Sequence, residues 1–231
     1  MTASPGHSAP TPQRIDLHSH SLLSDGKVTP TEMWFEARAL DHRALALTDH
    51  AGLEDKRPML ERLQQEAESW ADEKFRPIVG VELTKVPPRR IADAAREARK
   101  VGAEIVIVHG ETIAEVVPEG TNHAAIESGQ VDVLAHPGLL DRKDAELARA
   151  NGVILEVSGR RGHSLSNGHV VEVAREAGAE IVVDSDAHEP ADLIPWVKAR
   201  RIALGAGVRE SELETVLTTN PTKLIRRLGG R

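Results

Sequence analysis

Residues 14–20 have the sequence RIDLHSH, a short apolar run that ends in two histidines one residue apart. Side chains on an extended strand alternate between its two faces, so His18 and His20 would point to the same side and could hold one metal ion together. The same arrangement, in which a histidine or a carboxylate follows an apolar run, recurs along the chain. It is seen in THD 48–50, GVEL 80–83, VHG 108–110, AHPG 135–138 and SDAH 185–188.

Apolar runs alternate with charged segments of helical period through most of the chain. We expect strands at residues 14–17, 44–48, 77–81, 104–108, 131–135, 153–157 and 181–183, with a weaker eighth strand at 201–205. We expect helices at residues 29–40, 57–74, 88–101, 122–128, 143–150, 167–177, 190–200, 211–218 and 221–228. This alternation predicts an α/β fold in which crossover helices join parallel strands.

Two architectures share this pattern, a closed TIM-like barrel and an open, doubly wound sheet. The length of 231 residues is at the low end for a β/α barrel. The candidate ligands nevertheless follow almost every strand, and only a closed ring brings all those strand ends together. The sequence therefore favours the barrel.

The composition argues against several classes of function. The net charge is −7, and the chain has two Phe, three Trp and no Tyr, so neither a broad basic surface nor a base-stacking platform for nucleic acid is expected. With no Cys, any metal must be held by imidazole and carboxylate, which suits Zn, Mn or Fe. The lack of cysteine is also compatible with a reducing cytosol, and we expect a cytoplasmic protein.

The sequence predicts one domain that follows a short tail. Residues 1–13 are rich in Pro, Ser, Thr and Ala and contain no apolar segment of a secretory signal, so we expect a disordered tail there. Residues 14–231 would form a single barrel domain. No stretch approaches the ~20 apolar residues that a membrane span requires.

Nine ligand-type side chains make up the candidate metal site: His18, His20, Asp25, His50, Glu82, His109, His136, Asp186 and His188. A single histidine is more often a core or loop residue, and Asp25 alone could be a turn former in Ser24-Asp25-Gly26. The ordered set favours a polynuclear metal centre at the barrel mouth. Asp16 and Asp49 are candidates to orient ligating imidazoles. His7, His42 and His123 follow no such pattern, and we expect them at the surface.

These motifs, in this order and spacing, resemble the PHP (polymerase and histidinol phosphatase) family of metal-dependent phosphoesterases. The resemblance extends from about Ile15 to His188 and implies a distorted (β/α)7 barrel with a cluster of two or three divalent ions. It implies that His18, His20, Glu82 and Asp186 hold the first ion. Glu82 would bridge to a second ion bound by His109 and His136, and Asp25, His50 and His188 would hold the third. Some members carry His one position after Asp25, where this chain has Gly26.

Clustered cations would activate a bridging water and neutralise charge on phosphoryl oxygens, so no protein nucleophile is needed. The water would lie among Glu82, Asp186, His109 and His136.

The segment SGRRGHSLSNGH 158–169 would lie over the same mouth. Its candidate phosphate-binding residues are Arg160, Arg161, His163, Asn167 and His169. The alternative is a solvated polar loop in which Asn167 caps the next helix. Glu156, just before this segment, could be another carboxylate of the inner rim or could pair with Arg160.

The leading interpretation is a phosphomonoesterase of the histidinol-phosphatase type that acts on a small phosphorylated substrate. A phosphodiesterase or exonuclease acting on nucleotides or short oligonucleotides is the second. A non-catalytic RNA-binding scaffold of PHP-like fold is the third, and it would be expected to lose ligands and gain basic surface. Metal-dependent amidohydrolases also begin with His-x-His, but Glu82 and the closing Asp-x-His favour the PHP family. No membrane partner is expected, and no oligomeric state is predicted.

Overall fold

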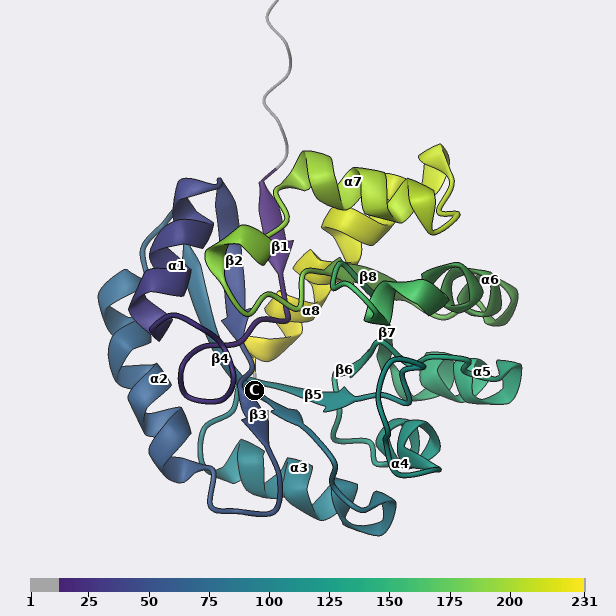
Figure 1. Cartoon of the computed structure of the whole chain (residues 1–231), viewed down its shortest axis with the longest axis horizontal. Coiled ribbons are helices and arrows are strands. Elements are labelled where there is room, and N and C mark those ends of the chain that lie inside the picture. The colour runs from purple at the N-terminus through teal and green to yellow at the C-terminus, as the bar shows by residue number, and fades with distance from the viewer. Residues whose placement is uncertain (1–12, 231) are drawn as a thin grey trace, which may run out of the picture.

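Seven parallel strands form a nearly closed barrel within residues 13–230, the part of the chain that the computed structural model describes (Figure 1). The strands are β1 Arg14–Asp16, β2 His42–Leu47, β4 Arg76–Leu83, β5 Ile105–His109, β6 Val133–Ala135, β7 Ile154–Ser158 and β8 Ile181–Asp184, paired in that order. The short β3, His50–Ala51, follows β2 and pairs with the end of β4. The predicted barrel is confirmed.

The barrel closes between its first and last strands. Ser19 and Ala187, just beyond the ends of β1 and β8, form one parallel bridge. Deeper in this seam, the carboxylates of Asp184 and Asp16 each accept a backbone N–H from the facing strand, at 2.9 and 3.0 Å. The buried guanidinium of Arg14 lies 3.6 Å from Asp16 and 3.7 Å from Asp184. These side-chain contacts join β1 and β8 along the part of the seam where the two strands form no β ladder.

Helices lie around the barrel and, in the case of the last one, across its amino end (Figure 1). They are α1 Pro30–Ala39, α2 Arg57–Trp70, α3 Ile91–Lys100, α4 Thr121–Glu127, α5 Arg142–Asn151, α6 Asn167–Ala177, α7 Trp196–Gly205 and α8 Asn220–Leu228. Local sequence explains several of their ends. Thr29 caps α1 by accepting the Glu32 N–H at 3.2 Å, and the left-handed glycines Gly152 and Gly178 end α5 and α6.

Near the carboxyl terminus one predicted strand is wrong, and two predicted helices differ from the structure in their bounds or helix type. Residues 201–205, expected as a weak strand, are the second half of α7, because Ala199 and Ala203 lie four residues apart on its buried face. The same helix begins at Trp196 rather than at residue 190, since a 3₁₀ turn and Pro195 precede it. Residues 211–218, predicted as one helix, are helical throughout but change type, because a 3₁₀ turn at Glu210–Glu212 passes into the π turn Thr215–Thr219 that leads into α8.

The apolar core has two layers. One fills the space between the strands and the outer helices. The other lies inside the barrel, where Leu224, Ile225 and Leu228 of α8 join the inward-facing residues of the strands. Arg76, at the start of β4, donates to the Ile225 carbonyl at 2.9 Å, so α8 closes the amino end of the barrel. The carboxyl ends of the strands are left as the open mouth.

Two sequence expectations concern the tail and the membrane. The predicted tail lies outside the described residues, apart from the exposed Gln13. Among residues 13–230, no helix is both long and apolar enough to cross a membrane.

Candidate metal centre

The nine predicted ligands converge at the open mouth of the barrel. They come from the segments after β1 (His18, His20, Asp25), from β3 (His50), β4 (Glu82) and β5 (His109), and from the segments after β6 (His136) and β8 (Asp186, His188). All are buried except Asp25, which is 54% exposed, and the partly exposed His50. The Nε2 atoms of His18 and His20 are only 3.1 Å apart, as the strand alternation predicted.

Glu82 lies at the middle of the cluster. Its Oε1 is 3.5 Å from Nε2 of both His18 and His136, and its Oε2 is 2.7 Å from His50 Nδ1 and 3.7 Å from His20 Nε2. Neither buried oxygen accepts a well-formed hydrogen bond. A buried carboxylate without such partners is costly unless a cation compensates it. The donor set therefore fits divalent ions bound on both sides of Glu82.

Asp186 faces the same interior from the opposite wall. Its Oδ1 is 3.3 Å from His20 Nε2, and its Oδ2 is 3.7 Å from His136 Nε2. Asp186 and His136 both have positive φ angles, 53° and 28°, although neither is glycine. Such backbone conformations cost free energy and are found preferentially at functional sites. With these backbone conformations, both side chains point into the cluster.

Asp25, His50, His188 and His20 form the outermost group of possible ligands. Asp25 Oδ1 is 3.1 Å from His188 Nε2, and its Oδ2 is 3.5 Å from His50 Nε2. Gly26 packs against the preceding turn, where an added Cβ would lie 2.7 Å from the backbone of His20. A side chain at position 26 is thus excluded in this conformation, and Asp25 alone supplies the carboxylate.

His109 and His136 form the group on the other side of Glu82, with ring centroids 4.5 Å apart. His163, predicted as a phosphate-binding residue, lies in the same group. Glu115, from the loop after β5, lies 3.7 Å from His109 Nε2. No apolar run precedes Glu115, so the motif pattern could not have identified it.

The carboxylate that orients a candidate ligand is Glu156, which the sequence offered either as a carboxylate of the inner rim or as a partner of Arg160. His18 Nδ1 donates to Glu156 Oε1 at 2.7 Å, and the His136 backbone N–H donates to its Oε2 at 2.9 Å. Neither Asp16 nor Asp49 makes a direct side-chain hydrogen bond to a candidate ligating imidazole. Asp49 instead accepts hydrogen bonds from the Ser21 and Ser24 hydroxyls and so orders the turn that carries Asp25.

Charges within the cluster shift one another's pKa. Burial alone would lower the pKa of His50, but Glu82 and Asp25 outweigh it and raise that pKa to about 10. Burial, with added repulsion from His18, lowers the pKa of His20 to about 4 although Asp186 opposes this. Burial would raise the pKa of Glu82, but His18 and His50 hold it well below its ordinary value. The carboxylates thus stay ionised and attract positive charge.

The segment after β7 divides into two parts. Arg160 donates to the Asp186 carbonyl at 3.2 Å and lies 2.7 Å from His188 Nδ1, while Arg161 is exposed. Both line a pocket of about 450 Å³ beside the cluster, together with Lys27 and Lys198.

Asn167 and His169 are held elsewhere. The Asn167 amide bonds both backbone groups of Ser158, at 3.1 and 2.8 Å, and His169 Nε2 donates to the Leu140 carbonyl at 2.7 Å. Their side chains support the loop, and a phosphate site at the mouth would rest on the arginines.

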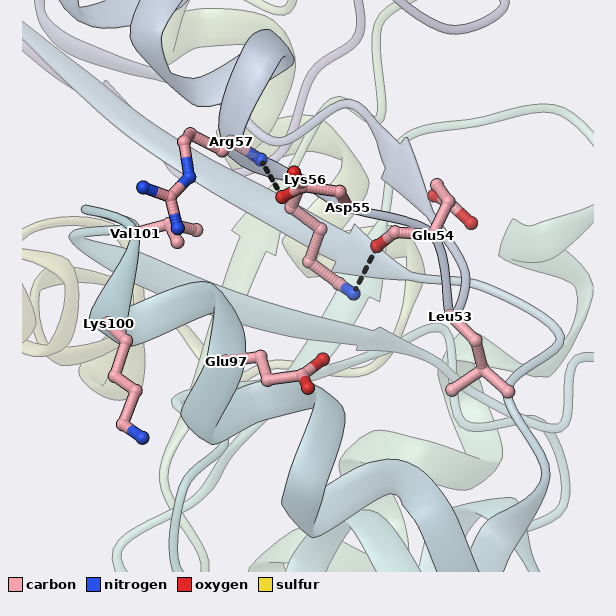
Figure 2. A pocket seen from close by; sticks show the side chains of 8 residues that line it. All are labelled: Leu53, Glu54, Asp55, Lys56, Arg57, Glu97, Lys100 and Val101. Atoms are coloured by element: carbon pink, nitrogen blue, oxygen red, sulfur yellow. Dashed lines mark hydrogen bonds between the residues drawn. The ribbon is translucent and has the colours of Figure 1, made fainter.

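A second groove lies outside the barrel wall, where the loop after β3 and the start of α2 meet the carboxyl end of α3 (Figure 2). Lys56 in its floor donates to the Glu54 carbonyl at 3.1 Å. None of the nine candidate ligands lines this groove. The chemistry is therefore expected at the mouth.

Comparisons with known proteins agree with this site. The PHP domain model matches residues 16–117. The uncharacterized protein MJ1295 of Methanocaldococcus jannaschii is 43% identical, over 93% of this chain and 100% of its own length. Ribonuclease P protein component 3 of Methanosarcina mazei is 28% identical, over 94% of this chain and 90% of its own.

A similar fold occurs in histidinol phosphate phosphatase from Lactococcus lactis, solved in complex with zinc, L-histidinol and phosphate. The TM-score is 0.62 and the identity 15%, with 85% of this chain and 95% of that chain covered. With the motifs, the barrel and these relatives in agreement, the chain belongs to the PHP-domain family.

Proposed function

We propose that this protein hydrolyses phosphate esters with the help of two or three divalent ions, Zn, Mn or Fe, held by the nine-residue cluster. The observation that carries the proposal is the convergence of these side chains around Glu82, whose buried oxygens lack well-formed hydrogen bonds. Ions bound there would act as Lewis acids and supply hydroxide at neutral pH.

The protein's own residues would position both the ions and the substrate. Glu82 and Asp186 each face imidazoles on two sides of the cluster, so each could serve two ion positions. Glu156 fixes the ring of His18 through Nδ1 and leaves Nε2 directed inward. Arg160 braces the backbone next to His188, and the exposed Arg161 is placed to bind a phosphoryl oxygen.

A small phosphomonoester is the proposed substrate. Four basic residues, Lys27, Arg160, Arg161 and Lys198, line the pocket beside the cluster together with three carboxylates, Asp186, Glu189 and Asp192. Because Lys27 pairs with Glu189 at 2.8 Å, the two arginines and Lys198 are the basic groups on which binding of a phosphate would depend. The chain as a whole carries a net charge of −7, which disfavours a long polyanion. A single phosphate group requires only the basic side chains beside the cluster.

The experiment is a hydrolysis assay on para-nitrophenyl phosphate and on a panel of phosphorylated metabolites, with Zn²⁺, Mn²⁺ or Fe²⁺ added. Arg161→Ala should lower kcat/KM by about tenfold, the worth of one charge-assisted hydrogen bond. Arg226→Ala, an exposed arginine on α8 at the opposite end of the barrel, is the matched control and should keep wild-type kinetics. Wild-type kinetics in Arg161→Ala would remove this residue from the substrate site.

Two other functions give different results in the same assays. A phosphodiesterase would cleave bis-para-nitrophenyl phosphate and leave the monoester intact. A non-catalytic scaffold, which the similarity to ribonuclease P protein component 3 makes worth testing, would stay inert after metal reconstitution.

A further inference from the structure

His163 lies against the candidate ligands from a loop of its own. It begins the 3₁₀ turn His163–Ser166 between β7 and α6 and is buried. Its ring stacks on that of His136, with centroids 4.0 Å apart and planes inclined by 17°. It meets the ring of His109 edge-on at 5.7 Å. Each ring nitrogen of a buried imidazole needs a hydrogen-bond partner or a metal ion to offset the free-energy cost of its burial.

The ring of His163 is oriented by a second loop. Its Nδ1 is 2.8 Å from the hydroxyl of Thr112, which follows β5. When Nδ1–H donates to this hydroxyl, the lone pair of Nε2 points into the cluster. A histidine that ligates a metal commonly donates its other ring N–H in this way, which fixes both its tautomer and its orientation.

Negative charge gathers where His163 Nε2 points. The carboxylate oxygens of Glu115 and Asp186 lie 3.8 and 4.0 Å from this atom. Ligand atoms of His109, His136 and His163 all lie within 4.8 Å of one another. These donor atoms therefore lie close enough together to hold one metal ion.

We propose that His163 is a metal ligand that completes a three-histidine site with His109 and His136, on the side of Glu82 away from Asp25. This rests on the proposed metal centre and replaces the phosphate-binding role expected for His163. Three imidazoles with a carboxylate suit Zn²⁺ or Fe²⁺. We expect this position to bind zinc more tightly than the outermost group, where Asp25 is half exposed.

The test is a zinc titration of chelator-stripped protein against a chromophoric competitor, without any substrate. His163→Ala should weaken one zinc equivalent by at least about 100-fold, because loss of an outer-shell partner alone costs about 10- to 100-fold. Thr112→Val, which keeps the ligand and removes only its orienting hydroxyl, should weaken the same equivalent by about 10- to 100-fold. The exposed His123, changed to Ala, is the matched control and should leave all equivalents unchanged.

Unchanged zinc affinities in both His163→Ala and Thr112→Val would overturn the proposal. Weaker inhibition of His163→Ala by inorganic phosphate in the hydrolysis assay would then place His163 on the phosphate. Circular dichroism of the metal-free proteins shows whether each variant folds. Should His163→Ala fail to fold, Thr112→Val alone decides between the two results. Because the titration needs no substrate, the absence of any hydrolase activity would count against the proposed function and leave the zinc result readable.

Discussion

Glu82 and His42 show how single residues in this barrel accommodate buried polar groups. Glu82 is surrounded by imidazoles, and its missing hydrogen bonds are explained by ions that would bind beside it. His42, which the sequence placed at the surface, is buried at the start of β2 near Asp16, 3.9 Å away. His123 is exposed as expected, and His7 lies outside the described residues. His42 is kept in the barrel in its neutral form.

The stability of the protein should depend on pH through His42. Burial, reinforced by Arg14 and opposed by Asp16, lowers its pKa from 6.5 to about 4. Between these values the unfolded chain binds the proton and the folded chain does not. The contribution of neutral His42 to the free energy of unfolding is therefore fully present above pH 6.5. This contribution, up to about 3 kcal/mol, is lost as the pH falls toward 4.

Urea unfolding from pH 7.5 to 4.5, with chelator present, measures this dependence. The free energy of unfolding should fall less steeply in His42→Leu than in the wild type, since the other histidines titrate equally in both proteins. Equal slopes in the two proteins would mean that His42 is protonated in the fold.

At the scale of elements, the turn of residues 21–26 depends on contacts with other segments. Asp49 accepts hydrogen bonds from two of its serines, and Gly26 packs against the backbone of His20. This turn places Asp25 within reach of His50 and His188. The outermost ion position is thus built by a loop, whereas the inner positions are built mainly on strand ends.

Gly26→Ala should remove the outermost ion and leave the others. The new Cβ would lie 2.7 Å from the backbone of His20 and Ser21, so the turn must move and take Asp25 with it. Elemental analysis of the reconstituted protein should show one ion fewer per chain than the wild type. Gly205→Ala, in α7 where nothing lies within 4 Å of the added carbon, is the control and should keep the full number. A full number in Gly26→Ala would contradict this account of the turn.

Most elements of the fold could be predicted from the sequence, because fully covered parallel strands form apolar runs that end in ligands. All seven strands of the barrel follow from that pattern, and so do the converging side chains other than Asp25, which lies in a turn. The end of the chain could not be predicted in the same way, since the apolar run 201–205 fits a strand or a buried helix face equally well. The contacts of Glu156 and Thr112 join segments that are distant in sequence, so no local pattern shows them.

At the scale of the whole molecule, the metal centre and α8 lie at opposite ends of the barrel. Leu224 and Leu228 fill the amino end. The candidate ligands lie at the mouth, on strands such as β4 and β5 and in the segments that follow β1, β6 and β8. The β1–β8 seam has a single β-bridge with backbone hydrogen bonds, and buried side chains add further contacts across it. Ions at the mouth would bind residues on both sides of this seam. Because such ions bind the folded state and not the unfolded chain, they would stabilise the folded protein.

The metal content of the purified protein tests the central claim most directly. After reconstitution with Zn²⁺ or Mn²⁺ and removal of free metal, elemental analysis should find two or three ions per chain. Glu82→Gln, which keeps the shape and removes the charge between two ion positions, should retain at most one. Fewer than one ion per chain in the wild type, or equal metal content in Glu82→Gln, would contradict the account.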